Sequence, residues 1–446
     1  MNAVPTSPAA VPSRGRVVAW GLWDWGSSAF NTIVLTFVFS VYLTDSVAAN
    51  LPAGSLSPNT WLTWSSATAG LLIALMAPVI GQSADRAGHR LRSTGVWTAA
   101  VVVAMLLMFF VRDDYHYLWL GLLLLGLASI FFELAQVSYF ALLSQVSTPA
   151  NVGRVSGFGW SLGYFGGILL LLLSYVGFIA GEGGAFGVST EGGLNIRVVV
   201  LVAAVWFAVF ALPMFLTLPE IRPTGRRTRL GVVGSYRALL GNLRELLREQ
   251  PHTVYFLGAS ALFRDGLNAI FVFGGVIAVT VYGMDPGTVL VFGVVINVVS
   301  AAGALAGGWL DDRIGPKAVV VGSLTSLVVV GTILLFVSGT TMFWIFGLIL
   351  GLFVGPAQAS SRSYLSRLCP EGQEGQMFGL YATTGRAVSF ISPALIGLFT
   401  FLGGERLGLL GIILVLVAGL AAVLPVHKPQ DAPSAAATRD APSSGA

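Results

Sequence analysis

Five charged side chains interrupt long apolar stretches of this sequence: Asp24, Glu133, Arg264, Asp265 and Arg386. A charge inside a membrane costs ~2.5–3.5 kcal/mol on insertion scales, so such residues mark a functional site by default. Carboxylates can accept protons or pair with ammonium groups, and guanidinium groups bind carboxylates. Cations buried beside carboxylates therefore indicate a site for a zwitterion or a small anion.

Uncharged polar residues accompany these charges. Residues three, four or seven positions apart share one face of a helix. This spacing joins Asn31 to Asp24, Gln136 to Glu133 and Asn268 to Arg264. Two further polar residues, Asn297 and Gln358, lie in later apolar stretches. We treat these ten residues as the candidates for substrate binding and proton coupling.

The carboxylates allow other interpretations. Asp24 lies about a turn and a half inside its helix, where it can serve as an interfacial anchor. Glu133 lies past the midplane, and a structural ion pair with Arg154 or another basic group would also explain it. As proton-coupling groups we rank Glu133 first, then Asp265, then Asp24, because depth raises the cost of a charge.

The buried arginines need partners. For Arg264 we expect one of the three carboxylates just named or a bound anion, and Arg386 is a second deep guanidinium group. Arg362, near the end of the tenth apolar stretch, is expected to face a loop or to pair with Asp312.

A short polar loop occurs twice. Gly81–Arg90 reads GQSADRAGHR, and Gly308–Lys317, 227 positions later, reads GWLDDRIGPK. Glycines in such a loop permit a tight reversal and close helix approach. One copy alone suits an ordinary positive-inside hairpin, but two copies about half the chain apart indicate two homologous halves. The gating candidates are Gly81, Asp85, Arg86, Gly88, Arg90, Arg154, Gly308, Asp312, Arg313, Gly315 and Lys317.

A second constant offset supports the duplication. Gln136, Ser138, Leu143 and Ser144 recur 222 positions later, as do Gly153, Gly157 and Gly163. Small residues repeated at helical spacing let helices pack closely. The fourth and fifth stretches therefore correspond to the tenth and eleventh.

The repeated loop resembles the signature G-x-x-x-D-R-x-G-[RK]-[RK] of the major facilitator superfamily (MFS), with His89 at a position where that family prefers a cation. Four stretches resemble its vacuolar-effluxer-like branch, the autophagy-related protein 22 type: DWGSSAF, GRVSGFGWSLGYFGG, QASSRSYLSRLCP and FGLYATTGRAVSF. Characterised fungal members are implicated in moving amino acids out of the vacuole. The resemblance also implies an inner gate in which Asp85 contacts the start of the eleventh span and a basic residue, Arg154.

Composition agrees with a membrane protein. Hydrophobic residues make up 55% and charged residues 10%, with a mean hydropathy of +0.82, against roughly 25% charged residues in soluble domains. Twelve apolar stretches near 20–44, 62–84, 93–112, 117–142, 153–179, 197–217, 253–281, 288–310, 318–338, 341–362, 376–402 and 407–425 each reach the ~20 residues that cross a bilayer. The expected surroundings are therefore lipid, and the net charge of +4 is not a sign of nucleic-acid binding.

These observations predict an all-α polytopic membrane protein, with twelve transmembrane helices in two pseudo-symmetric six-helix bundles. Most Lys and Arg fall in the termini and even-numbered loops, which places both termini in the cytoplasm. We expect a bacterial inner-membrane protein. Its parts are a disordered lead (1–19), the first bundle (20–217), a cytoplasmic linker with an amphipathic helix (218–251), the second bundle (252–425) and a disordered tail (426–446).

Sequence motifs argue against an enzyme. No H-E-x-x-H or G-K-[ST] pattern is present, and no G-x-S-x-G lies between an expected strand and a helix. Cys369, the only cysteine, permits neither an intrachain disulfide nor a Cys/His metal site. We therefore expect no cofactor and no metal. The expected function is a monomeric secondary transporter for a small polar solute, an amino acid as first choice, driven by an ion gradient and most simply by protons. The alternatives are efflux of sugars or drug-like compounds, or a receptor or scaffold that transports nothing.

Overall fold

The computed structural model describes residues 13–49, 51–52, 54–181, 183–220, 232–370 and 372–427, and all regular secondary structure in these ranges is helical. Twelve helical segments in this part are long and apolar enough to cross a membrane, as predicted, so the chain is a multi-pass integral membrane protein. Residues 1–12 of the predicted lead, 221–231 of the predicted linker and 428–446 of the predicted tail lie outside the described residues.

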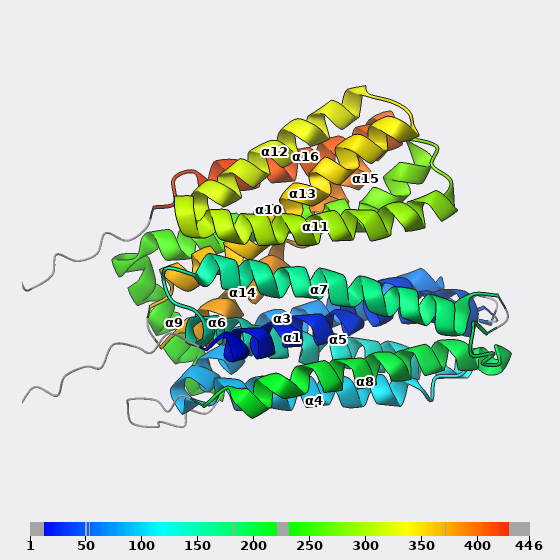
Figure 1. Cartoon of the computed structure of the whole chain (residues 1–446), viewed down its shortest axis with the longest axis horizontal. Coiled ribbons are helices and arrows are strands. Elements are labelled where there is room, and N and C mark those ends of the chain that lie inside the picture. Colours follow the sequence, from blue (N-terminus) through cyan, green and yellow to red (C-terminus); the bar gives the residue numbers. More distant parts are fainter. Residues whose placement is uncertain are drawn as a thin grey trace, which may run out of the picture.

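The first half contains α1 (Arg14–Ala29), α2 (Phe39–Tyr42), α3 (Pro58–Ala87), α4 (Arg90–Met108), α5 (Leu118–Ala141), α6 (Leu143–Val146), α7 (Val152–Ser174) and α8 (Leu194–Thr217). After α9 (Val232–Glu249), the second half contains α10 (Pro251–Thr280), α11 (Pro286–Ile314), α12 (Pro316–Phe336), α13 (Thr340–Leu368), α14 (Glu374–Val388), α15 (Ile391–Gly403) and α16 (Glu405–Val423). Figure 1 shows the two halves as separate groups of roughly parallel helices. Their main contacts join α3 to α14 and α7 to α11.

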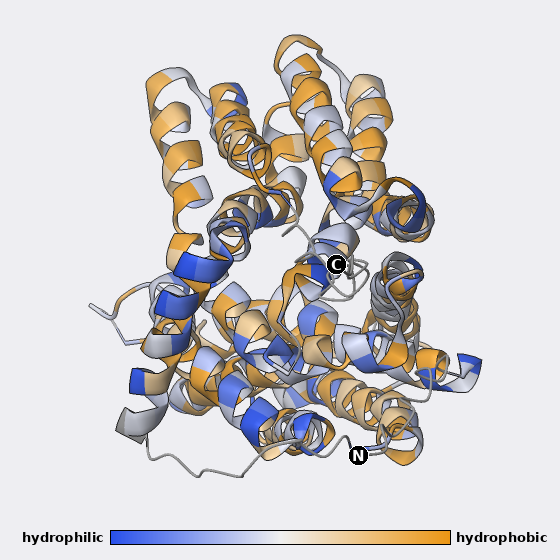
Figure 2. Cartoon of the chain, turned by 90° about the vertical axis from the view of Figure 1, so that its left-hand side faces the viewer, coloured by the Kyte–Doolittle hydropathy of each residue, from blue (hydrophilic) through white to orange (hydrophobic). Residues whose placement is uncertain are grey.

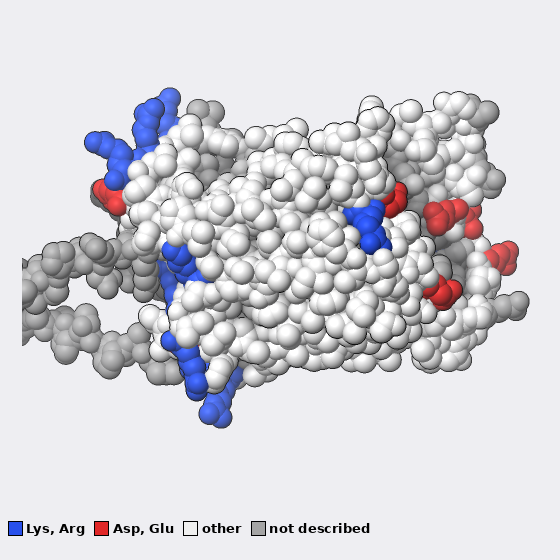
Figure 3. All heavy atoms as spheres, turned by 90° about the horizontal axis from the view of Figure 1, so that it is seen from above, with Lys and Arg blue, Asp and Glu red and all other residues white. Residues whose placement is uncertain are grey.

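Both polar loops lie at one end of the bundle, which we call the motif end. In each loop the second glycine has a positive φ, 64° at Gly88 and 91° at Gly315. Residues other than glycine rarely adopt this backbone conformation. Seen from this end, most helices lie nearly end-on with apolar residues over much of their outer surface (Figure 2). On the face in Figure 3, Lys and Arg gather mainly at the motif end and Asp and Glu at the opposite end.

Two spans are irregular. The first continues from α1 through π-helical turns at Phe30–Phe37 and Leu43–Val47, and the eleventh is interrupted at Ser389 and Phe390, between α14 and α15. π-Helical turns occur frequently at functional sites. Both irregular segments border the cavity described below.

Two predicted boundaries were wrong. Residues 14–19, assigned to a disordered lead, belong to α1, because a helix satisfies its own backbone hydrogen bonds and can extend beyond the hydrocarbon core. The tenth span continues past residue 362 to Leu368, which places Arg362 within the helix rather than in a loop.

Candidate functional site

A cavity of about 1230 Å³ lies between the two halves. Its lining includes eight of the ten candidate residues: Asp24, Asn31, Glu133, Gln136, Asn268, Asn297, Gln358 and Arg386. A recess of about 240 Å³ shares part of this lining and adds the remaining two, Arg264 and Asp265. The structure thus brings all ten candidates to one site.

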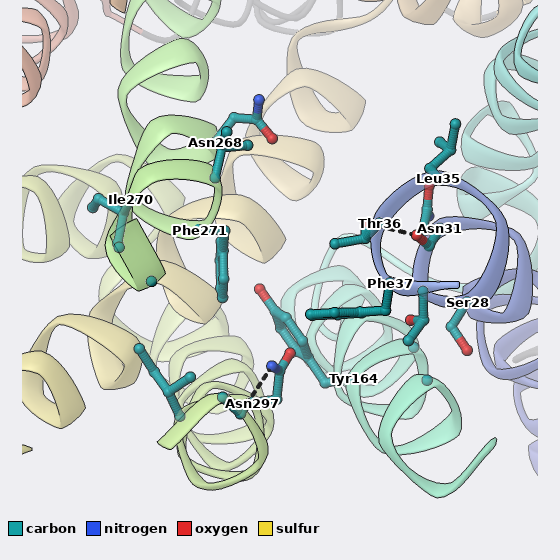
Figure 4. Close-up of a pocket in the computed structure, with 18 of the residues that line it drawn as sticks. Ser28, Asn31, Leu35, Thr36, Phe37, Tyr164, Asn268, Ile270, Phe271 and Asn297 are labelled. Carbon is teal, nitrogen blue, oxygen red and sulfur yellow. Dashed lines mark hydrogen bonds between the residues drawn. The ribbon is translucent and has the colours of Figure 1, made fainter. Parts of the chain in front are cut away.

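The cavity extends away from the motif end. Its lining reaches Val38, beyond the middle of the first span, and Ile179 and Gly287, at the far ends of the fifth and eighth spans. In Figure 4, Asn268 and Phe271 of α10 lie across from Asn31 and Phe37 of the first span. Both halves therefore supply polar and aromatic groups to the same space.

Sequence reasoning missed two polar aromatic residues of α7. Tyr164 projects between the halves in Figure 4, with its ring centroid 6.2 Å from that of Phe271. The Tyr164 hydroxyl and the Trp160 indole N–H are buried and have no hydrogen-bond partner among the described residues. Both residues line the cavity, and an unsatisfied buried polar group is costly. Sequence reasoning therefore missed two polar groups of the lining that lack a partner in the described part of the chain.

Two ion pairs cross between the halves at the inner part of the cavity. Arg386 Nη2 lies 2.7 Å from Glu133 Oε2, and Arg362 Nη1 lies 3.3 Å from Asp24 Oδ2. Arg386 remains 41% exposed, whereas Arg362 is only 1% exposed. The first pair therefore faces the cavity, and the second forms part of its floor.

The expectation for Arg362 was wrong, since it neither faces a loop nor pairs with Asp312. It donates through Nε to Ser156 Oγ (3.0 Å) and through Nη2 to the Ser156 carbonyl (2.7 Å). The guanidinium group also lies against the rings of Trp20, Phe140 and Trp160. A usable signal existed, because Arg362 is four residues beyond Gln358 and so shares its helical face.

The adjacent residues Arg264 and Asp265 serve different elements. Arg264 donates to the Tyr381 carbonyl (2.9 Å) and lies 3.5 Å above the centre of the Tyr381 ring. Asp265 accepts a hydrogen bond from the Ser392 N–H (2.8 Å) at the start of α15. Among the described residues no carboxylate forms a salt bridge with Arg264, so its anion-binding capacity is available within the recess.

At the motif end, two carboxylates cap helices of the opposite half. Asp85 accepts from the N–H groups of Gly375 (3.0 Å) and Gln376 (2.8 Å) at the start of α14. Asp312 accepts from the N–H groups of Gly153 (2.8 Å) and Arg154 (3.1 Å) at the start of α7. A carboxylate at a helix N-terminus is stabilised by the orphan N–H groups and the helix dipole.

The basic partners differ from expectation. Arg154 pairs with Asp312 (2.8 Å) rather than with Asp85, because each loop contacts the opposite half. The cation bound to Asp85 is Arg90 of its own loop, at 2.7 Å. The other basic residues of the two loops make different contacts. Arg313 lies over the Trp309 ring, Lys317 donates to the Leu424 carbonyl, and Arg86 is half-buried at the end of α3.

Close backbone packing accompanies these caps. A Cβ atom on Gly81 would lie 2.0 Å from the Gly375 carbonyl oxygen, and one on Gly157 would lie 2.3 Å from the Ala304 carbonyl oxygen. Only glycine fits both sites. The motif end is therefore closed by direct helix contact as well as by charge.

Comparison with known proteins is consistent with this geometry. The family model described as "Vacuole effluxer Atg22 like" matches residues 58–435. The MFS-type transporter YxiO of Bacillus subtilis is 26% identical over 408 residues, which cover 90% of this chain and 92% of that protein. Autophagy-related protein 22 of Cryptococcus neoformans is 24% identical over 60% of this chain, and the match spans about half of that protein, 49%. Among solved structures, the MFS proton:xylose symporter XylE superposes with a TM-score of 0.71 at 12% identity, covering 92% of this chain and 94% of that one, a likeness in fold.

Proposed function

The chain belongs to the vacuole effluxer Atg22-like family of MFS transporters, and we propose that it moves an amino acid across the membrane by alternating access, coupled to protons. Transport of a small solute, rather than enzymatic catalysis, is the activity that the family and fold support. The observation that carries the proposal is the cavity between the halves, open away from the motif end and lined by charges of both signs.

The places where the halves touch support alternating access. To open the motif end, α3 must leave α14 and α7 must leave α11, which breaks the two carboxylate caps. The ion pairs Glu133–Arg386 and Asp24–Arg362 also join opposite halves and must rearrange. Opening the motif end therefore requires both the caps and the ion pairs between the halves to break.

A zwitterion suits the cavity chemically. Arg264 offers a guanidinium group that forms no salt bridge with any described carboxylate, and it can bind a solute carboxylate. Glu133 and Asp24 can receive an ammonium group in exchange for their present arginine partners. An amino acid carries both charges, whereas a sugar carries neither.

For proton coupling we propose Glu133. Its partner Arg386 is partly exposed to the cavity, so a proton and a substrate ammonium group can both compete for the carboxylate. A protonated Glu133 releases Arg386, which removes one contact between the halves. Asp265 and Asp24 remain the second and third candidates.

The distribution of charge supports an orientation. Because Lys and Arg concentrate at the motif end (Figure 3), we propose that this end and both termini face the cytoplasm, in a bacterial inner membrane. The cavity then opens to the outside. We further propose that a monomer suffices, since the cavity lies within one chain.

The test is solute counterflow with purified protein in liposomes. Labelled amino acids should exchange saturably, and a pH gradient should drive net accumulation. The matched variants are Arg264→Gln, expected to lose binding, and Arg406→Gln, which removes a cation outside the cavity and should leave exchange intact. Absence of flux across amino acids, sugars and organic anions, together with copurification of a stable partner protein, would instead favour a receptor or scaffold.

A further inference from the structure

Helix α9, in the segment that joins the halves, rests on both of them. One face, including Ser235, Leu239 and Leu246, is buried, and the helix contacts α3 of the first half and α10 of the second. The Tyr236 hydroxyl donates to the Leu75 carbonyl of α3 (2.7 Å). In Figure 1 the helix lies at the motif end, so it braces the two halves where they are closed.

The same helix reaches the gate directly. Asn242 Nδ2 donates to Gln376 Oε1 (2.9 Å), and Gln82 of α3 donates to the same oxygen (3.1 Å). Gln376 is 2% exposed, and its backbone N–H is one of the two that Asp85 holds. One glutamine side chain thus links α9, α3 and the capped start of α14.

The exposed residues of α9 are sorted by type around the helix. At ~100° per residue, the exposed Arg237, Arg244 and Arg248 fall within about 40° of one another. The exposed leucines, Leu240 (64%) and Leu247 (50%), lie on one side of this arginine stripe. The exposed glutamates, Glu245 and Glu249, lie on the other side.

The order leucine, arginine, glutamate matches the change from hydrocarbon through phosphate to water across a membrane surface. Tyr236 lies on the leucine side and bonds to Leu75, which is ten residues, or roughly 15 Å, along α3 from Asp85 toward the middle of the membrane. This arrangement fits a bilayer in which acyl chains lie against the leucines, phosphates against the arginines and water against the glutamates. Such a face is typical of helices in the plane of an interface, where each basic residue is attracted to anionic lipid.

We propose that the stripe of Arg237, Arg244 and Arg248 binds the headgroups of anionic lipids, and that lipid bound there holds α9 on the gate and favours the closed motif end. The proposal rests on the motif end being a gate, as in the proposed function, but not on the identity of the substrate. Opening separates α3 from α14 and so breaks at least one contact of α9. Lipid that fixes the docked helix therefore binds the closed state better, which is the condition for shifting the population.

The experiment compares nanodiscs of phosphatidylcholine alone with nanodiscs that also contain phosphatidylglycerol. Gate opening is followed by the rate at which a water-soluble maleimide labels Cys369, close to the gate residues Asp85, Arg90 and Glu374. Phosphatidylglycerol should slow labelling of the parent by about fivefold, the factor that corresponds to ~1 kcal/mol. The triple variant Arg237→Gln, Arg244→Gln, Arg248→Gln should lose this effect, and the corresponding lysine variant should keep most of it.

Matched controls make the outcome decisive. The variant Arg14→Gln, Arg16→Gln, Arg92→Gln removes the same charge from exposed positions at the same end and should retain the lipid effect. Asn242→Ala should still bind phosphatidylglycerol but show a weaker effect on the gate. An equal lipid effect in the parent and in the α9 glutamine variant, or the same slowing by soluble glycerol phosphate, overturns the proposal. If counterflow persists while the lipid effect is absent, only this proposal fails; a lipid effect without flux of any solute contradicts transport instead.

Discussion

Replacing Asp85 by Asn tests the gate most directly, because Asn keeps the shape of the side chain and removes its charge. The carboxylate is 5% exposed and accepts hydrogen bonds from two backbone N–H groups of α14 and from Arg90 Nε. The Asn amide group has one acceptor oxygen, so at least one of the backbone N–H groups loses its acceptor. The attraction to Arg90 is lost as well. We expect folding to persist and the motif end to open more often.

The magnitude follows from these contacts. A hydrogen bond to a charged group contributes ~1.5–3 kcal/mol, and an unsatisfied buried donor costs ~1–3 kcal/mol. Water reaches the site when the gate opens, so we expect about 3 kcal/mol of the closed-state preference to disappear, or roughly 100-fold in the open-to-closed ratio. Asp312→Asn is the matched control. Arg154 is 58% exposed, so its attraction to Asp312 is screened, and Arg367, the second cation on Asp312 (3.1 Å), keeps Asp311 as a partner (2.8 Å). We therefore expect only about tenfold for this variant.

The assay is pulsed electron–electron double resonance, which measures the distance between spin labels at Ser144 and Ile314. Both are exposed positions near the motif end, one in each half. The labels are attached to introduced cysteines in a Cys369→Ser background, since removal of Asp85 would change the reactivity of Cys369 itself. A long-distance population should grow in Asp85→Asn and grow less in Asp312→Asn. Identical distance distributions in the parent and Asp85→Asn, with equal thermal stability, would refute the reasoning.

Three further outcomes are expected. Glu133→Gln should abolish accumulation driven by a pH gradient yet retain exchange, because exchange needs no net proton release; accumulation at the parental rate in liposomes would exclude Glu133 as the coupling site. Gly157→Ala should keep the motif end from closing, since the new Cβ would lie 2.3 Å from a backbone oxygen, and closed-state label distances in that variant would contradict this. Burial raises the pKa of the Cys369 thiol well above its ordinary value of 9.0, and the nearby carboxylates of Glu374 and Asp85 raise it further. The reactive thiolate therefore forms only at higher pH, so the rate of maleimide labelling should still rise by about tenfold per pH unit above pH 9, whereas a rate that levels off just above pH 9 would indicate an ordinary thiol.

The sequence predicted which residues line the cavity better than it predicted how they pair. Depth along a helix and shared faces follow from one span at a time, and they sufficed to select ten residues that line the cavity or its recess. The ion pairs Glu133–Arg386 and Asp24–Arg362 join residues 253 and 338 positions apart. Such pairings depend on how the two halves dock, which helical periodicity does not encode.

The misassignment of Arg154 has a different origin. The 222-residue offset relates Gly153 to Gly375, and Asp85 caps the helix that begins near Gly375. The same symmetry implies that the second loop, through Asp312, caps the helix that begins near Gly153 and so meets Arg154. The internal repeat therefore contained the correct pairing, and the resemblance to the superfamily signature pointed away from it.

The two interhalf ion pairs also suggest an order of events. A solute entering from the open end meets the pair Glu133–Arg386 first, because Arg386 is 41% exposed and Arg362 only 1% exposed. Truncating one partner of a buried pair costs about 3–5 kcal/mol, so Asp24–Arg362 should separate only when water or substrate replaces both partners. The hydrogen bonds from Arg362 to Ser156 cross the same boundary and must break in that step. We therefore expect exchange at Glu133 to precede opening of the floor, which makes Glu133 the group through which occupancy of the cavity is communicated to the gate.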